Sequence, residues 1–174
     1  MKVIVFGPPG GGKSTLSARI AHAAGLPLHP LDCIQYAAGG ARLPDEAFNE
    51  RLAALSAGPS WVIDGYGTPQ FFDRLVQAAD VLVYVRRPAW VHWWWVTKRL
   101  LQSPVRAPPG WPERPPMLRS TMSSYRALRF TDRFWTPAFR ARLEALPPPK
   151  RVVFIRRERE ARALVASLAS SPPA

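Results

Sequence analysis

A glycine-rich segment near the N-terminus has the residue types and the spacing of a phosphate-binding loop. Residues 7–14 read Gly-Pro-Pro-Gly-Gly-Gly-Lys-Ser, which completes the pattern G-x-x-x-x-G-K-[ST]. Glycines let the backbone turn so that successive N–H groups point at one anion. An apolar run precedes the segment and a helix-compatible run follows it, which favours nucleotide binding over a glycine-rich turn that binds nothing. The predicted nucleotide-binding residues are Gly7, Pro8, Pro9, Gly10, Gly11, Gly12, Lys13, Ser14 and Thr15.

Three side chains of this segment have specific expected roles. Lys13 is spaced to reach the β- and γ-phosphates, so it is also a candidate catalytic residue. The Ser14 hydroxyl is a candidate ligand of the magnesium ion that accompanies the nucleotide, and Thr15 is a candidate contact to the α-phosphate. The pattern therefore predicts a nucleoside triphosphate and Mg²⁺ as the cofactors.

Two aspartates follow predicted strands and are candidate catalytic residues. Asp64 comes directly after the apolar run at residues 61–63, and Asp32 follows a weaker run at residues 28–31. Ligands of open parallel sheets bind at the carboxyl ends of the strands, so both carboxylates should share one rim with the phosphate loop. Asp64 would hold the magnesium ion or its water. Asp32 would orient an acceptor hydroxyl or take its proton, or cap the N-terminus of the next helix; these two roles are compatible.

The elements that must position these residues alternate along the chain. Apolar runs separated by helical segments, without any hairpin signal, predict an α/β protein with a parallel, doubly wound sheet. A length of 174 residues fits one domain over residues 1–174. Thr68 followed by Pro69 is a helix start, and Gly25 is a helix stop. The predicted strands are residues 3–6, 28–31, 61–63, 81–85 and 152–155, and the predicted helices are 13–24, 44–55, 68–79, 88–102 and 158–168, with 117–146 mostly helical.

The segment between the last two strands differs in composition from the rest. Residues 86–140 hold eleven Lys or Arg and two Asp or Glu, a net charge of +9 within a chain of +12. Such a surface suits either polyphosphate or nucleic acid. Residues 93–95 are three consecutive tryptophans, too wide an arc for one buried helical stripe. We expect packing between the core and a lid to account for them more readily than stacking on bases.

Cysteine and hydropathy indicate a soluble cytoplasmic protein. Cys33 is the single cysteine, so no internal disulfide can form, and its simplest role is that of a small buried residue. No signal peptide is expected, and the longest strongly apolar stretch, residues 90–97, is too short to span a membrane. The three histidines His22, His29 and His92 lack metal-site spacing, so structural or surface roles are expected.

Several segments together resemble the adenylate-kinase-related "DNA topology modulation protein" family of small P-loop kinases. The similarity covers nearly the whole chain. The segments that carry it are residues 7–16, 25–27, 31–32 and 61–66, Arg74, residues 79–80 and 87–88, and the run Gly-Trp-Pro-Glu-Arg at 110–114.

The resemblance implies a P-loop NTPase three-layer sandwich, with five parallel strands in the order 2-3-1-4-5 and helices on both faces. It also implies ATP as the nucleotide, an acceptor-binding helical segment at residues 33–58 and a lid at residues 104–125. Arg114 would be the catalytic lid arginine, with Arg106 and Arg119 as further candidates, and Arg99 would face the nucleotide.

Departures from the family's pattern bear on the acceptor. Adenylate kinases follow Asp-Gly with an aromatic residue, proline and a phosphate-binding arginine, whereas Gly67 and Thr68 follow Tyr66 in this chain. The sequence therefore predicts phosphoryl transfer from Mg-ATP to a small-molecule acceptor, with AMP disfavoured and other nucleotides or nucleosides among the candidates. The alternatives are an ATP-dependent nucleic-acid-binding protein and a simple NTPase switch. They differ from a kinase in that ATP consumption needs no second small molecule.

Overall fold

The computed structural model describes residues 1–36, 41–102 and 136–170, and within 99–102 the backbone only. Every structural statement below concerns these residues. The lid expected at 104–125 lies outside them, as do Arg106, Arg114 and Arg119.

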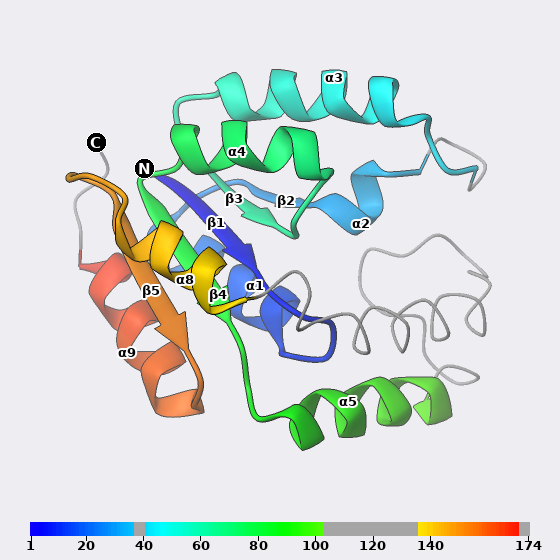
Figure 1. Ribbon diagram of the computed structural model, residues 1–174, viewed down its shortest axis with the longest axis vertical. Helices are drawn as coiled ribbons and strands as arrows, with labels where there is room; N and C mark the ends of the chain where they lie inside the picture. The colour runs from blue at the N-terminus through cyan, green and yellow to red at the C-terminus, as the bar shows by residue number, and fades with distance from the viewer. Residues whose placement is uncertain (37–40, 103–135, 171–174) are drawn as a thin grey trace.

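The described chain is built around one parallel sheet, as predicted (Figure 1). Every residue of β3 and β4 is buried, as is every residue of β1 after Lys2, which explains why these strands read as continuous apolar runs. The strand order is β2-β3-β1-β4-β5, which confirms the predicted topology. The strands are β1 (Lys2–Phe6), β2 (Leu28–Pro30), β3 (Trp61–Asp64), β4 (Val81–Val85) and β5 (Arg151–Ile155).

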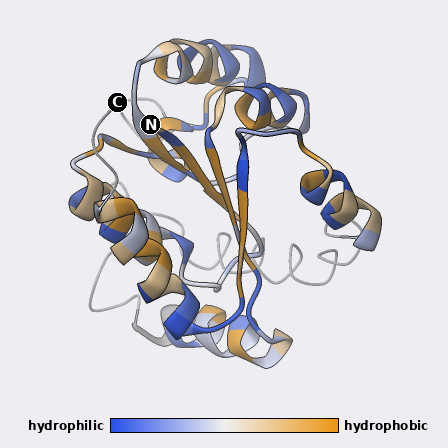
Figure 2. Ribbon diagram, turned by 90° about the vertical axis from the view of Figure 1, so that its left-hand side faces the viewer, coloured by the Kyte–Doolittle hydropathy of each residue, from blue (hydrophilic) through white to orange (hydrophobic). Residues whose placement is uncertain are grey.

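Helices cover both faces of the sheet, so the predicted three-layer sandwich is confirmed. One face packs against α1 (Lys13–Ala24) and α9 (Glu158–Ala169) through aliphatic side chains. The other face packs against α3 (Asp45–Ala57), α4 (Pro69–Ala78) and α8 (Pro137–Glu144), with Phe6 and Phe72 in edge contact at 5.1 Å between ring centroids. Figure 2 shows the hydrophobic strands between the two layers of helices.

The local signals fix most of the helix ends. Gly25 follows α1 in the left-handed conformation (φ 64°), and the Thr68 hydroxyl accepts a hydrogen bond from the N–H of Phe71 to start α4. One prediction is wrong: Asp32 does not cap a helix, because α2 (Leu31–Ile34) starts one residue earlier and Pro30 occupies its N-cap position. In the described part of residues 117–146, the helix is limited to α8.

Helix α5 (Ala89–Gln102) carries the tryptophans, and they are exposed. The exposed fractions run from 40% for Trp93 to 72% for Trp90, so none of the four lies in the core. The expected packing against a lid involves residues outside the described part of the chain. Within the described ranges, no helix is both long and apolar enough to cross a membrane.

Candidate phosphate-binding site

The glycine-rich loop connects the end of β1 to the start of α1 at the carboxyl edge of the sheet (Figure 1). Gly7, Gly10 and Gly12 have φ angles of 140°, 76° and 83°, which side chains rarely allow. A Cβ atom at Gly7 would also lie 2.2 Å from the Val85 carbonyl oxygen of β4. Gly7 is therefore required both by its backbone conformation and by the close approach of β4, whereas Gly10 and Gly12 share the requirement of backbone conformation.

The loop leads directly into the N-terminus of α1, where a helix attracts anions. The first turn reads Lys-Ser-Thr-Leu and holds no acidic residue, and no side-chain cap is found there among the described residues. The Lys13 Nζ atom reaches back across the loop and donates a hydrogen bond to the Pro8 carbonyl at 2.9 Å. Backbone N–H groups, the helix dipole and an ammonium group thus converge on one place, which suits an oligophosphate.

Asp64 ends β3 beside the strand that leads into the loop. It is paired with Val5 in the β1–β3 register, and its side chain is 8% exposed. Burial raises the pKa of the Asp64 carboxyl above its ordinary value, and the charge of Asp32 adds to the rise. The Ser14 hydroxyl and the Lys13 charge act in the opposite sense. Asp64, Ser14 and Lys13 are therefore brought together, as the sequence suggested.

The Asp64 carboxylate fits a magnesium ligand. Its Oδ1 atom is buried and has no hydrogen-bond partner within the described part of the chain. Mg²⁺ at phosphoryl-transfer sites is commonly held by one or two protein oxygens together with the phosphates and water. The described residues contain no cluster of three or more His, Cys, Asp or Glu that could hold a metal ion. Ser14 and Asp64 are the residues that would hold Mg²⁺.

Asp32 lies at the same rim of the sheet, but it is exposed to solvent. Pro30, two residues before it, is paired with Asp64 in the β2–β3 register. The Asp32 side chain is exposed, and its charge contributes to the raised pKa of both Asp64 and Cys33. An accessible carboxylate near the phosphate loop can accept a proton from a bound hydroxyl.

Two residues that were not predicted to belong to the site, His92 and Arg87, also contact the loop. His92 is 3% exposed, and its Nδ1 atom lies 2.7 Å from the Pro9 carbonyl oxygen. The Arg87 side chain donates from Nε to the Gly11 carbonyl at 3.1 Å. A structural role for His92 was expected, but its position was not, since an isolated histidine on a tryptophan-rich helix carries no spacing signal.

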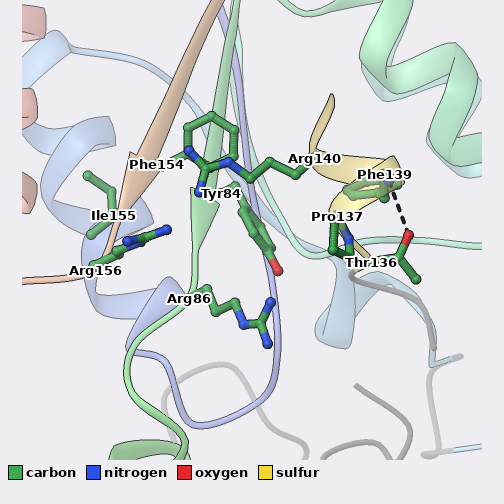
Figure 3. Close-up of a pocket in the computed structure, with 9 residues that line it drawn as sticks. All are labelled: Tyr84, Arg86, Thr136, Pro137, Phe139, Arg140, Phe154, Ile155 and Arg156. Carbon is green, nitrogen blue, oxygen red and sulfur yellow. Dashed lines mark hydrogen bonds between the residues drawn. The ribbon is translucent and has the colours of Figure 1, made fainter. Parts of the chain in front are cut away.

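The remaining predicted contacts are arginines. Arg99 lies on α5, but its side chain is outside the described part of the structure, and Arg114 lies wholly outside it. The structure adds arginines that the sequence did not single out. A cavity of about 250 Å³ lies at the carboxyl ends of β4 and β5. Arg86, Arg140 and Arg156 line it together with aromatic side chains (Figure 3). This cavity adds positive charge to the rim of the sheet that carries the loop.

Comparison with known proteins identifies solved structures of similar fold. No protein-family model matches the chain, and no curated protein sequence matches it. A shikimate kinase from Acinetobacter baumannii, solved in complex with shikimate, is similar with a TM-score of 0.60 and 17% identity over 96% of this chain and 89% of that chain. A protein from Chloroflexus aurantiacus to which a kinase activity is ascribed has a TM-score of 0.55 and 18% identity, over 96% of this chain and 95% of that chain. A gluconokinase from Sinorhizobium meliloti has a TM-score of 0.49 and 21% identity, over 97% of this chain and 93% of that chain.

Structural similarity at sequence identities this low establishes only the fold. The narrower resemblance to DNA topology modulation proteins stays a prediction from the sequence. The sheet order, the loop between β1 and α1 and the similarity to these structures agree on one conclusion: the chain has the fold of the small P-loop kinases.

Proposed function

We propose that the chain is a kinase that transfers the γ-phosphoryl group of Mg-ATP to a small-molecule acceptor. The observation that carries the proposal is the placement of Asp64, a buried strand-end carboxylate with an unpartnered Oδ1 among the described residues, beside Lys13 and Ser14. A glycine-rich turn that bound nothing would have no need for a buried carboxylate at this position, since burial of its charge is unfavourable.

Each group at the site has a distinct task in this reaction. The loop N–H groups and Lys13 bind the β- and γ-phosphates and neutralise their charge. Ser14 and Asp64 hold Mg²⁺, which supplies further positive charge to the transferring phosphoryl group. Because phosphoryl transfer needs little covalent assistance from protein, positioning and charge supply most of the rate. The same requirement explains why the site is built from a rigid loop on a central strand.

The acceptor side of the proposal depends on Asp32 and on the segment that follows it. Residues 33–58 contain part of α2, an isolated antiparallel bridge between Tyr36 and Arg42, and α3. Asp32 begins this segment at the rim of the sheet, where it would orient an acceptor hydroxyl and take its proton. A hydroxylated metabolite is therefore the preferred class of acceptor, in line with the shikimate bound to the kinase of similar fold.

The test is transfer of label from [γ-³²P]ATP to a panel of acceptors with Mg²⁺ present. The panel contains hydroxylated carboxylic acids, sugars and sugar acids, nucleosides and nucleoside monophosphates. Asp32→Asn should lower kcat for the labelled acceptor by about 10²- to 10⁴-fold, the usual contribution of a general base. Asp80→Asn is the matched control, because Asp80 is also exposed but precedes β4 at the opposite edge of the sheet.

The outcomes separate the candidate functions. Labelled acceptor in one class, with the loss confined to Asp32→Asn, supports the kinase and identifies its substrate class. ADP formation that is the same with every acceptor and without any would instead support the NTPase switch and overturn the kinase.

A further inference from the structure

We propose that His92 and Arg87 are positioning residues that hold the phosphate loop in its anion-binding conformation from the outer side, and that His92 does so only as a neutral ring. The inference rests on the proposed nucleotide site but concerns residues that neither the sequence motif nor the comparisons assign to it.

The hydrogen bonds of these residues fix the direction of two loop peptides. His92 bonds to the carbonyl of Pro9 and Arg87 to the carbonyl of Gly11, at 2.7 and 3.1 Å. In a trans peptide, the N–H of the next residue points away from the carbonyl. Holding these two oxygens towards His92 and Arg87 therefore turns the N–H groups of Gly10 and Gly12 to the side away from these two side chains. That side is where the loop N–H groups must converge to bind phosphate.

The loop also lies in steric contact with the start of α5. A Cβ atom at Gly10 would be 2.6 Å from the His92 carbonyl oxygen, and one at Gly11 would be 3.0 Å from the His92 ring carbon Cε1. The ring is thus packed against the loop as well as bonded to it. Movement of α5 at His92 would be transmitted directly to the phosphate-binding peptides.

The two hydrogen bonds of the ring define its protonation state. A carbonyl only accepts, so the Nδ1 atom must carry the proton that is shared with Pro9. The Nε2 atom accepts the backbone N–H of Arg87 at 3.1 Å and must keep its lone pair. A protonated ring would place a second N–H against the N–H of Arg87 and break this contact.

The charges that face the ring also favour its neutral form. Burial is the main cause that lowers the pKa of His92, and the charges of Lys13 on α1 and Arg86 after β4 lower it further, while the hydrogen bonds to Pro9 and Arg87 act in the opposite sense. The Arg87 guanidinium is directed away, to Gly11 and to Glu158 of α9. The first turn of α5 carries no acidic residue. The pKa of His92 therefore lies below the ordinary histidine value, so the ring stays neutral to lower pH than it would in water.

Arg87 is itself fixed by two other elements of the core. Its terminal nitrogen pairs with Glu158 at 2.9 Å, and the same carboxylate pairs with Arg19 of α1 at 2.7 Å. The loop carbonyl of Gly11 is thus connected through Arg87 and Glu158 to α9 and α1. These two helices hold the guanidinium in place.

The first experiment is an NMR titration of the wild-type chain labelled with ¹⁵N. The expected result is an Nδ1–H tautomer for His92, with a pKa below the ordinary histidine value, and Gly10 and Gly12 amide shifts that follow the His92 midpoint. An Nε2–H tautomer, or loop amides indifferent to His92 titration, would overturn the proposal. This readout needs no nucleotide, so it remains decisive if Mg-ADP does not bind and the proposed function fails.

The second experiment measures Mg-ADP affinity by calorimetry. Removing both ring hydrogen bonds in His92→Ala should raise Kd about tenfold or more at pH 7.5. His92→Asn can still donate to Pro9, so it should recover part of the loss, and His22→Ala should bind as the wild type does. As the pH falls from 7.5 through the His92 midpoint found by NMR, affinity should weaken more for the wild type than for His92→Asn, because only the wild type has a ring to protonate. Nucleotide protonation affects both proteins equally. Equal affinities for His92→Ala and the wild type would refute the positioning role.

Discussion

Alanine at Gly10 and at Gly12 should have different effects on stability, although both residues belong to the phosphate loop. Their φ angles are nearly the same, 76° and 83°, so alanine costs each about 1–2 kcal/mol of backbone strain. At Gly12 the new Cβ meets nothing within 4 Å. At Gly10 it would lie 2.6 Å from the His92 carbonyl oxygen and 3.1 Å from the Val96 Cγ2 atom, so the loop or α5 must move.

Overpacking of this kind costs about 1–3 kcal/mol, which makes the expected loss about 1–2 kcal/mol for Gly12→Ala and about 2–5 kcal/mol for Gly10→Ala. The excess for Gly10→Ala corresponds to about 2–12 °C in Tm for a chain of this size. Urea unfolding followed by circular dichroism measures both variants against the wild type. Equal free energies of unfolding for the two variants would refute the packing of the loop on α5.

Two further predictions concern carboxylates of the site and of its support. Asp64→Asn should make the ligand-free chain more stable than the wild type at pH 7 and abolish Mg²⁺-dependent nucleotide binding. Because its pKa is raised by burial, Asp64 keeps its proton to higher pH in the folded state than in the unfolded state. Its ionisation therefore lowers the free energy of unfolding as the pH rises through the folded pKa. A lower Tm for the variant than for the wild type would contradict this. Glu158→Gln should cost less than about 1 kcal/mol, since the Glu158 side chain is 45% exposed. Arg87 and Arg19 lower the pKa of Glu158, so its contribution is present above the unfolded pKa and is lost as pH falls through the folded pKa; a pH-independent loss in the urea midpoint of the variant would count against these pairs.

Features that depend on short segments of the sequence could be predicted. β1 and β4 appear as uninterrupted apolar runs because both faces of a parallel strand are buried. The start of α4 is encoded by Thr68 and Pro69, one as a hydrogen-bond acceptor and the other as a residue with a helical φ angle. The phosphate loop was predictable for the same reason, since its glycines and its lysine are fixed by spacing along the chain.

Features that depend on distant contacts could not be predicted in the same way. His92 is separated from Pro9 by 83 residues, and nothing in its neighbours on α5 indicates that contact. The expected capping role of Asp32 failed because β2 ends at Pro30, which is paired with Asp64, and α2 begins at the next residue, so Pro30 takes the N-cap position. The arginine-lined cavity is likewise formed only where β4, β5 and α8 meet.

The central claim, that the loop of residues 7–15 binds Mg-ATP through Lys13, is tested most directly by calorimetric titration of ATP with Mg²⁺ into the wild type and Lys13→Ala. We expect saturable binding with one nucleotide per chain, weakened at least about tenfold in Lys13→Ala because an ammonium–phosphate contact is lost. Lys150→Ala is the control, because Lys150 instead donates to the carbonyls of Gln77 and Ala79 at the opposite edge of the sheet and should leave the affinity unchanged. No heat of binding in the wild type, or equal affinity in wild type and Lys13→Ala, would contradict the claim.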